Sequence, residues 1–185
     1  QARCKLGGDT LMINRLKNPR FYSYQQMKEL FTGPNLSWSY SQDLQFEQPP
    51  EGHQRMPFMS HNILIRPEHI GYPTKASPYF NMVCFALKEI LEFNDVKIKG
   101  LYRINANLTF PTAPLLPSIP HVDHDFPHEN VLIYLNDTGG DTVVDGEHYS
   151  PHEDDVITFG GEKHYMYPPE KGGRIVIVAT YETSN

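Results

Sequence analysis

The stretch that decides the fold runs from His121 to Arg174 and reads HVDHDFPHENVLIYLNDTGGDTVVDGEHYSPHEDDVITFGGEKHYMYPPEKGGR. It contains short runs of apolar and β-branched residues, separated by turn sequences that include Gly139-Gly140, Asp145-Gly146 and Gly172-Gly173. Such runs are typical of strands, because β-branched side chains fit a pleated sheet and glycine permits tight turns. Many short strands in succession favour a double-sheet β fold such as a jelly roll.

The same pattern of short strand-like runs and turn residues begins before this stretch and continues after it. From residue 98 onward we expect strands over Gly100–Thr109, His121–Asp123, Asn130–Asn136, Thr142–Asp145, Asp155–Phe159, His164–Tyr167 and Arg174–Tyr181. Further upstream the sequence predicts short strands over Thr10–Asn14, Leu36–Tyr40 and His61–Ile65, and a loop over residues 47–60.

Two helices are predicted in the first half of the chain. Ser23–Phe31 places apolar residues on one side and is followed by Gly33-Pro34, which stops a helix. The second begins at Ser77-Pro78, because serine is a good N-cap and proline suits the first helical turn. Its apolar residues recur at spacings of three and four up to Asn94, which gives one buried face.

The chain of 185 residues is long enough for one domain with a full core. We therefore expect a single domain over residues 1–185, in which residues 1–99 form a scaffold of helices and strands. Residues 100–181 would form the β core. The expected fold class is mainly β with flanking helices.

Composition limits the classes of partner that the protein could bind and the cellular compartment in which we expect it. The net charge is −6 with no basic cluster, which makes a nucleic-acid substrate unlikely. No apolar run approaches the roughly 20 residues that span a bilayer, and no secretory signal is visible. Cys4 and Cys84 are far apart, and Cys84 lies among apolar residues, so we expect a buried free thiol and a reducing, cytoplasmic location.

The candidate metal-ligating residues lie among the histidines between residues 121 and 164. Residues i and i+2 of a strand point to the same face, so His121 and Asp123 would direct an imidazole and a carboxylate at one point. A second histidine would complete the two-histidine, one-carboxylate set of non-haem Fe(II) oxygenases, which leaves coordination positions open. Chemistry alone leaves the third ligand ambiguous. His148 and His152 sit among acids and turn residues, whereas His164 opens an apolar strand, which favours His164.

Arg174 follows Gly172-Gly173 and opens the apolar strand that continues with Ile175. A buried arginine needs a partner, because an unpaired buried charge is energetically costly. Its planar guanidinium suits a carboxylate. The partner is either an internal acid, in a structural salt bridge, or an acidic ligand.

Together these residues resemble the Fe(II)- and 2-oxoglutarate-dependent dioxygenases, and most closely their prolyl-hydroxylase-like branch. The resemblance covers about residues 100–181 and rests on His121-Val122-Asp123, the Tyr134-Leu135-Asn136 strand end, His164, and Arg174 ten residues later. It implies a double-stranded β-helix (jelly roll, cupin-like) with N-terminal scaffold helices and an iron ion at its mouth.

The resemblance also assigns roles to individual residues. His121, Asp123 and His164 would be the iron ligands, and Arg174 would pair with the distal carboxylate of 2-oxoglutarate. Tyr134 and Asn107 match positions that contact the same co-substrate in some relatives. The implied reaction uses O₂ to convert 2-oxoglutarate to succinate and CO₂ while a C–H bond of a small-molecule or peptide substrate is hydroxylated.

Two alternatives stay open from the sequence. A cupin-like metal protein would use the same ligands without 2-oxoglutarate, and a degenerate barrel would only bind. The proline-rich run 111–120, which leads into His121, is either a stiff loop beside the site or a recognition motif for an SH3-like partner. We favour the loop. The substrate and the oligomeric state are not determined by the sequence.

Overall fold

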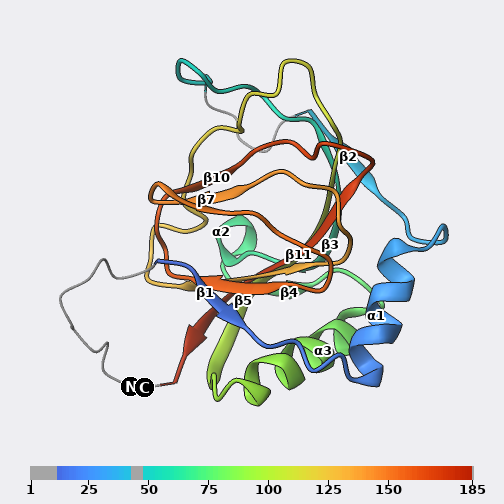
Figure 1. The fold of residues 1–185 in the computed structure, drawn as a ribbon. Coiled ribbons are helices and arrows are strands. Elements are labelled where there is room, and N and C mark those ends of the chain that lie inside the picture. The colour runs from blue at the N-terminus through green and yellow to red at the C-terminus, as the bar shows by residue number, and fades with distance from the viewer. Residues whose placement is uncertain (1–11, 43–47, 185) are drawn as a thin grey trace.

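The computed structural model describes residues 12–42 and 48–184. These residues form two antiparallel sheets, and the two longer helices, α1 (Tyr22–Thr32) and α3 (Phe80–Phe93), lie together on one side (Figure 1). The third described helix is the short α2 (Pro67–Ile70). The strands are β1 (Asn14–Leu16), β2 (Ser39–Ser41), β3 (Phe58–Ile65), β4 (Thr74–Lys75), β5 (Ile98–Thr109), β6 (Glu129–Tyr134), β7 (Thr142–Val144), β8 (Glu147–Tyr149), β9 (Val156–Phe159), β10 (His164–Met166) and β11 (Arg174–Thr183).

The larger sheet has eight strands in the order β1-β9-β6-β11-β5-β3-β2, with β4 paired to β3. The smaller sheet has the order β10-β7-β8. Strands from residues 1–99 thus join the same sheet as strands from the second half of the chain. This is the mainly β architecture with flanking helices that the sequence predicts.

Side chains along the central strand β11 point alternately to the side covered by helices and to the inner side of the sheet. Ile175 and Ile177 belong to the apolar core that α1 and α3 cover. Arg174, Val176 and Val178 point the other way and line an inner cavity. Because strand side chains alternate between faces, one strand builds both the core and the site.

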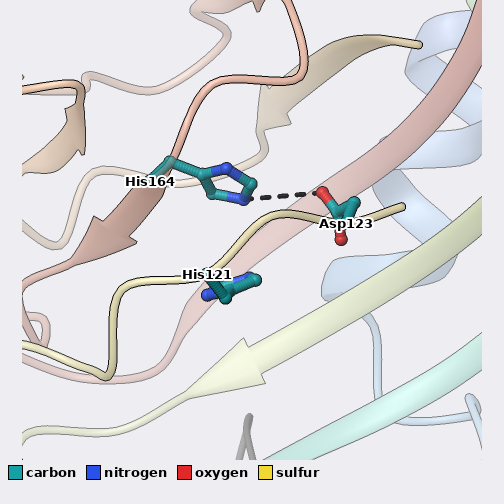
Figure 2. A group of neighbouring side chains, drawn as sticks. All are labelled: His121, Asp123 and His164. Carbon is teal, nitrogen blue, oxygen red and sulfur yellow. Dashed lines mark ion pairs between the residues drawn. The ribbon is translucent and has the colours of Figure 1, made fainter. Parts of the chain in front are cut away.

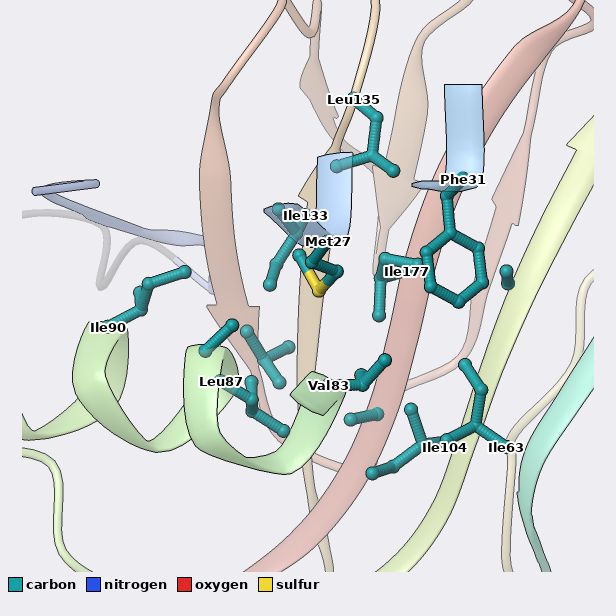
Figure 3. Packing of buried hydrophobic residues seen from close by; sticks show 14 of the residues in the cluster. Met27, Phe31, Ile63, Val83, Leu87, Ile90, Ile104, Ile133, Leu135 and Ile177 are labelled. Atoms are coloured by element: carbon teal, nitrogen blue, oxygen red, sulfur yellow. The ribbon is translucent and has the colours of Figure 1, made fainter. Parts of the chain in front are cut away.

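The core fixes that strand firmly in place. Figure 3 shows Leu87 of α3 and Met27 of α1 packed with Ile133 and Ile177 of the sheet. All four side chains are fully buried. The apolar face predicted for the second helix is therefore the face that packs on the sheet.

The predicted boundaries of that helix are close to those observed. The hydroxyl of Ser77 accepts a hydrogen bond from the backbone N–H of Tyr79 (3.1 Å), and regular helix begins one residue later, at Phe80. At the other end, the side-chain amide of Asn94 donates to the carbonyl of Ile90 (2.8 Å). Asn94 ends the helix as predicted.

Several local predictions differ from the structure. The strand predicted over His121–Asp123 is wrong, since His121 forms only an isolated bridge. The strand predicted over Leu36–Tyr40 begins later, at Ser39, and the strand predicted to begin at His61 begins at Phe58. The first predicted strand lies partly outside the described residues, and the observed β1 starts where that prediction ends. Helix α2 and strands β4 and β8, each of four residues or fewer, were not predicted.

Cys84 is a free thiol, half-buried against the core, whose burial raises its pKa to about 11. Cys4 lies outside the described residues. None of the described helices is long and apolar enough to cross a membrane.

Candidate metal centre

Three side chains predicted as metal ligands come together where the two sheets face each other. His164 is the first residue of β10, and its backbone exchanges two hydrogen bonds with His121 (2.9 Å each). Asp123 follows His121 by two residues, and its carboxylate reaches the His164 ring (Nε2–Oδ2, 3.4 Å). Figure 2 shows the three side chains converging. The bridge between His121 and His164 thus brings the ligands together, although the predicted strand is absent.

The two imidazoles are oriented by backbone carbonyls. His121 Nδ1 lies 3.1 Å from the carbonyl oxygen of Ile119, and His164 Nδ1 lies 3.0 Å from that of Glu162. A carbonyl only accepts, so each Nδ1 is a donor and Nε2 is the ring nitrogen left for a metal ion. Burial lowers the pKa of His121 to about 4, so its ring is neutral at pH 7. An imidazole whose Nδ1 is held by a carbonyl is oriented as a metal ligand requires.

The two carboxylate oxygens of Asp123 have different surroundings. Oδ1 forms ion pairs with Arg103 and, at 3.5 Å, with Arg66. Oδ2 is buried and has no hydrogen-bond partner. Burial by itself opposes ionisation, but Arg103 and the neighbouring imidazoles and Arg66 hold the pKa of Asp123 well below its usual range. The aspartate is therefore a carboxylate with one oxygen held and one oxygen free.

This arrangement fits a divalent metal ion. One nitrogen of each histidine and one oxygen of Asp123 all lie within 4.8 Å of one another. Two imidazoles and one carboxylate suit iron, zinc, copper or nickel, and the set of two histidines and one carboxylate with open positions is that of non-haem Fe(II) oxygenases. The orphaned Oδ2 is explained if a cation binds beside it, because a buried acceptor without a partner is costly.

Arg174 lies in the same cavity and forms no ion pair among the described residues, although Asp141 attracts it from a greater distance. Its Nη1 donates to the carbonyl of Gly140 (2.6 Å), and its Nη2 contacts the sulfur of Met166 (2.7 Å). Its Nε is buried without a partner. Burial lowers the pKa of Arg174, as expected for a desolvated cation. Arg174 as a whole is 3% exposed, so its guanidinium is a buried positive charge without an ion pair to compensate it.

The metal ligands and Arg174 share a cavity of about 120 Å³. Its floor is built by β5 and β11. On β5, Asn107 and Thr109 each carry a buried side-chain oxygen that has no hydrogen-bond partner. On β11, Val176 and Val178 supply an apolar strip beside them. The cavity therefore offers a cation and unsatisfied polar atoms at one end, and apolar contact along its length.

Tyr134 does not line this cavity. Its hydroxyl shares a 2.7 Å hydrogen bond with Thr142, which does line it, and the guanidinium carbon of Arg174 lies 5.8 Å from the ring centre. Burial raises the pKa of Tyr134 to about 12. Tyr134 thus supports Thr142 and Arg174 from behind, while Asn107 faces the cavity directly.

The other two candidate histidines lie outside this group. The side chains of His148 and His152 are 51% and 71% exposed, and they face Asp141 and Asp155. Sequence reasoning missed Arg103 and Arg66, which hold Asp123. Arg103 could have been found, because it precedes Asn107 by four residues on one strand and shares its face. Arg66 comes from a distant segment and carries no such signal.

The proline-rich run is held against the protein by hydrogen bonds, and one of its residues lines the cavity. The side-chain amide of Gln54 donates to Thr112 Oγ1 and to the carbonyls of Pro114 and Leu116, at 2.5 to 3.1 Å. Ser118 exchanges hydrogen bonds with Met166 of β10 and lines the cavity. These contacts agree with a stiff loop beside the site, the alternative favoured from the sequence.

No protein-family model and no curated protein matches the sequence. Solved structures do match. A 2-oxoglutarate-Fe(II) oxygenase family protein from Burkholderia pseudomallei superposes with a TM-score of 0.68 at 13% identity, covering 94% of this chain and 86% of the other. A prolyl hydroxylase from Trichoplax adhaerens, in complex with a hypoxia-inducible-factor peptide, gives 0.55 at 15% identity over 92% and 83%. A non-haem α-ketoglutarate-dependent epimerase from nogalamycin biosynthesis gives 0.57 at 12% identity over 92% and 77%.

The fold is therefore the double-stranded β-helix of the 2-oxoglutarate-Fe(II) oxygenases, and neighbours with this fold include a prolyl hydroxylase. The resemblance noted in the sequence is confirmed at the level of the fold. At identities of 12 to 15%, the comparisons speak to the fold alone. The chemistry of this chain has to be argued from its own residues.

Proposed function

We propose that the protein is an Fe(II)- and 2-oxoglutarate-dependent oxygenase that hydroxylates a C–H bond of its substrate. One observation carries the proposal. A buried arginine that forms no ion pair among the described residues shares a small cavity with two histidines and a carboxylate that converge on one point. A cupin-like protein that only bound a metal would have no use for that unpaired cation, so this alternative is weaker.

The proposed roles follow from the contacts. His121, Asp123 and His164 hold iron through two nitrogens and Oδ2. Arg174 binds the distal carboxylate of 2-oxoglutarate, which supplies the ion-pair partner that its guanidinium lacks. Asn107 offers a polar contact to the same co-substrate, and Tyr134 contributes by fixing Thr142 and the position of Arg174.

Iron with 2-oxoglutarate and O₂ supplies an oxidant for C–H bonds, while 2-oxoglutarate becomes succinate and CO₂. The protein contributes positioning. Arg103 and the carbonyls of Ile119 and Glu162 fix the ligands before any metal arrives, which lowers the reorganisation needed on binding. Val176 and Val178 keep one side of the cavity apolar, which limits access of water to the reacting centre.

For the substrate we propose a small molecule or a peptide, with a prolyl-hydroxylase-like reaction as one candidate. The Trichoplax neighbour was solved with a peptide, and the neighbour from nogalamycin biosynthesis is an α-ketoglutarate-dependent epimerase. The net charge of −6 stands against a nucleic-acid substrate.

Metal binding and turnover test this proposal. Wild-type protein, His164→Ala and His148→Ala are each loaded with Fe(II) without oxygen, freed of unbound metal, and assayed for bound iron. They then receive 2-oxoglutarate and air, and succinate is measured with and without candidate substrates. We expect His164→Ala to lose iron and succinate formation, because it removes one of three ligands. The exposed His148→Ala should keep both. Equal iron content in all three proteins would contradict the proposal.

A further inference from the structure

Charge is unevenly distributed in the cavity. Three arginines and one carboxylate line it, and the arginines lie at two ends. Strand register defines the ends, since Arg174 pairs with Thr109 whereas Arg103 pairs with Thr180. The six-residue step from 103 to 109 along β5 corresponds to roughly 20 Å between backbone positions. Arg174 therefore occupies one end, and Arg103 with Arg66 the other.

At the second end, two guanidinium groups share a single carboxylate. Arg103 pairs with Asp123 Oδ1. Arg66 donates from Nη1 to the backbone carbonyl of Asp123 (2.9 Å), while its Nη2 lies 3.5 Å from the same Oδ1. Burial and the nearby charge of Arg103 both lower the pKa of Arg66. One of the two positive charges has no counterion of its own in the cavity.

The nearest other acid lies outside the cavity. Glu68, on α2, attracts Arg66 and partly offsets the lowering of the Arg66 pKa. It accepts a hydrogen bond from His124 Nδ1, however, does not line the cavity, and forms no ion pair with Arg66 among the described residues. Arg66 is also the more accessible of the two arginines, with 26% of its side chain exposed against 13% for Arg103. Arg103 pairs with Asp123, whereas Arg66 lines the cavity and has more N–H groups than its two contacts with Asp123 use.

We propose that the primary substrate carries an anionic group, a carboxylate or a phosphate, which binds Arg66 with support from Arg103. This rests on the proposed function, in which the metal and Arg174 take up both carboxylates of 2-oxoglutarate. Metal and co-substrate together carry no net charge, so binding them leaves the positive excess beside Asp123 in place. An anion held there has its neighbouring carbon atoms close to the metal ligands.

Binding of small probes to the assembled site tests this. Mn(II) replaces iron to prevent turnover, and saturating 2-oxoglutarate occupies Arg174. N-acetyl-L-proline, its uncharged amide N-acetyl-L-prolinamide, and methyl phosphate are then titrated by calorimetry. The acid and the amide share size and skeleton, but only the acid is charged, and the acid and methyl phosphate distinguish a carboxylate from a phosphate. The proteins are wild type, Arg66→Met, Arg66→Lys and Arg15→Met. Arg15 has 67% of its side chain exposed and lies outside the cavity, so its variant controls for lost surface charge.

We expect at least one anionic probe to bind wild type more tightly than the amide, by about tenfold or more, because charge-assisted hydrogen bonds are the strong ones. Arg66→Met should remove this preference, Arg66→Lys should retain much of it, and Arg15→Met should not change it. Added salt should weaken the anion's binding and leave the amide unaffected.

Equal binding of acid and amide, unchanged anion affinity in Arg66→Met, or no binding of either anion at millimolar concentration would each overturn the inference. Circular dichroism and a thermal melt establish that every variant is folded. Binding of 2-oxoglutarate to the Mn(II)-loaded protein, measured first, reports the proposed function separately. If it is intact while the anions fail, only the inference about the substrate fails.

Discussion

Gly140, two residues before β7, holds the guanidinium of Arg174 in place through its backbone carbonyl. Its carbonyl accepts the Nη1 hydrogen bond of Arg174, and its φ of 84° lies in the region that favours glycine. A Cβ at this position would lie 2.6 Å from the carbonyl oxygen of Pro168, too close for that backbone to remain in place. The position of the one cation that faces the metal ligands from the far end thus depends on a glycine.

We therefore expect Gly140→Ala to cost more stability than Gly146→Ala. Gly146 has the same φ of 84°, but an added Cβ there meets nothing within 4 Å. The control should lose about 1–2 kcal/mol from left-handed strain alone, and Gly140→Ala should lose more and also bind 2-oxoglutarate more weakly. Urea unfolding and calorimetry measure the two effects. Equal losses in both variants would show that the close contact with Pro168 does not matter.

Asp154 ties α1 to the segment before β9. It accepts hydrogen bonds from the hydroxyl of Tyr24 (2.5 Å) and from Lys28 (2.6 Å), and it pairs with Arg20 (3.1 Å). Partial burial alone would raise its pKa, but the hydrogen bonds from Lys28 and Tyr24 outweigh burial and lower the pKa. The ionised form therefore stabilises the folded protein.

Because the folded-state pKa of Asp154 is lowered, its contribution is present above the unfolded-state pKa of about 3.9 and is lost as the pH falls through the lower folded-state value. We expect Asp154→Asn to lose about 1–3 kcal/mol at pH 7 and to approach wild type in acid. Asparagine tolerates the positive φ of this residue, so backbone strain is matched. Asp95→Asn, at an exposed residue with φ of 58°, is the control. A stability difference that does not change with pH would contradict this.

At the scale of elements, helix α3 holds the larger sheet from the side opposite the cavity. Leu87 is fully buried in the shared core, whereas Phe85 on the same helix is 58% exposed. We expect Leu87→Ala to lose about 2–5 kcal/mol in urea unfolding, since it leaves a cavity in a packed core. Phe85→Ala should lose far less. A small loss for Leu87→Ala would mean that α3 is not needed to hold the sheet.

The elements that could be predicted from the sequence are those with a strong local pattern. The apolar spacing of α3 and the β-branched run of β11 defined both elements to within a few residues. The bridge between His121 and His164 could not be predicted, because it joins residues 43 positions apart and His121 lies outside the regular strands. Pairing at that separation depends on the whole fold.

The candidate site was predictable to a similar extent. The two-residue step singled out His121 and Asp123, and strand context singled out Arg174 and favoured His164 over the exposed His148. The support of Asp123 by Arg66 was not predictable, because α2 brings that arginine from a segment without any motif. The indirect position of Tyr134 also depends on packing, here against Thr142.

At the scale of the whole molecule, two facing sheets bring distant charges into one cavity. The metal ligands come from β10 and from the segment 121–123 that is bridged to it, Arg174 opens the central strand, and Arg66 precedes α2. We propose that residues 1–185 form a single domain. Within it, the core on the helix side holds the strands that carry the site.

Binding of 2-oxoglutarate tests the central proposal most directly. Calorimetry without oxygen compares Fe(II)-loaded and metal-free wild type with Fe(II)-loaded Arg174→Met and Arg174→Lys. We predict that tight binding requires the metal, falls by about a hundredfold or more in Arg174→Met, and is partly retained in Arg174→Lys, because the distal carboxylate loses a charge-assisted bidentate partner. Iron content should be the same in all loaded proteins. Equal affinity in Arg174→Met, or equal affinity without metal, would contradict the proposal.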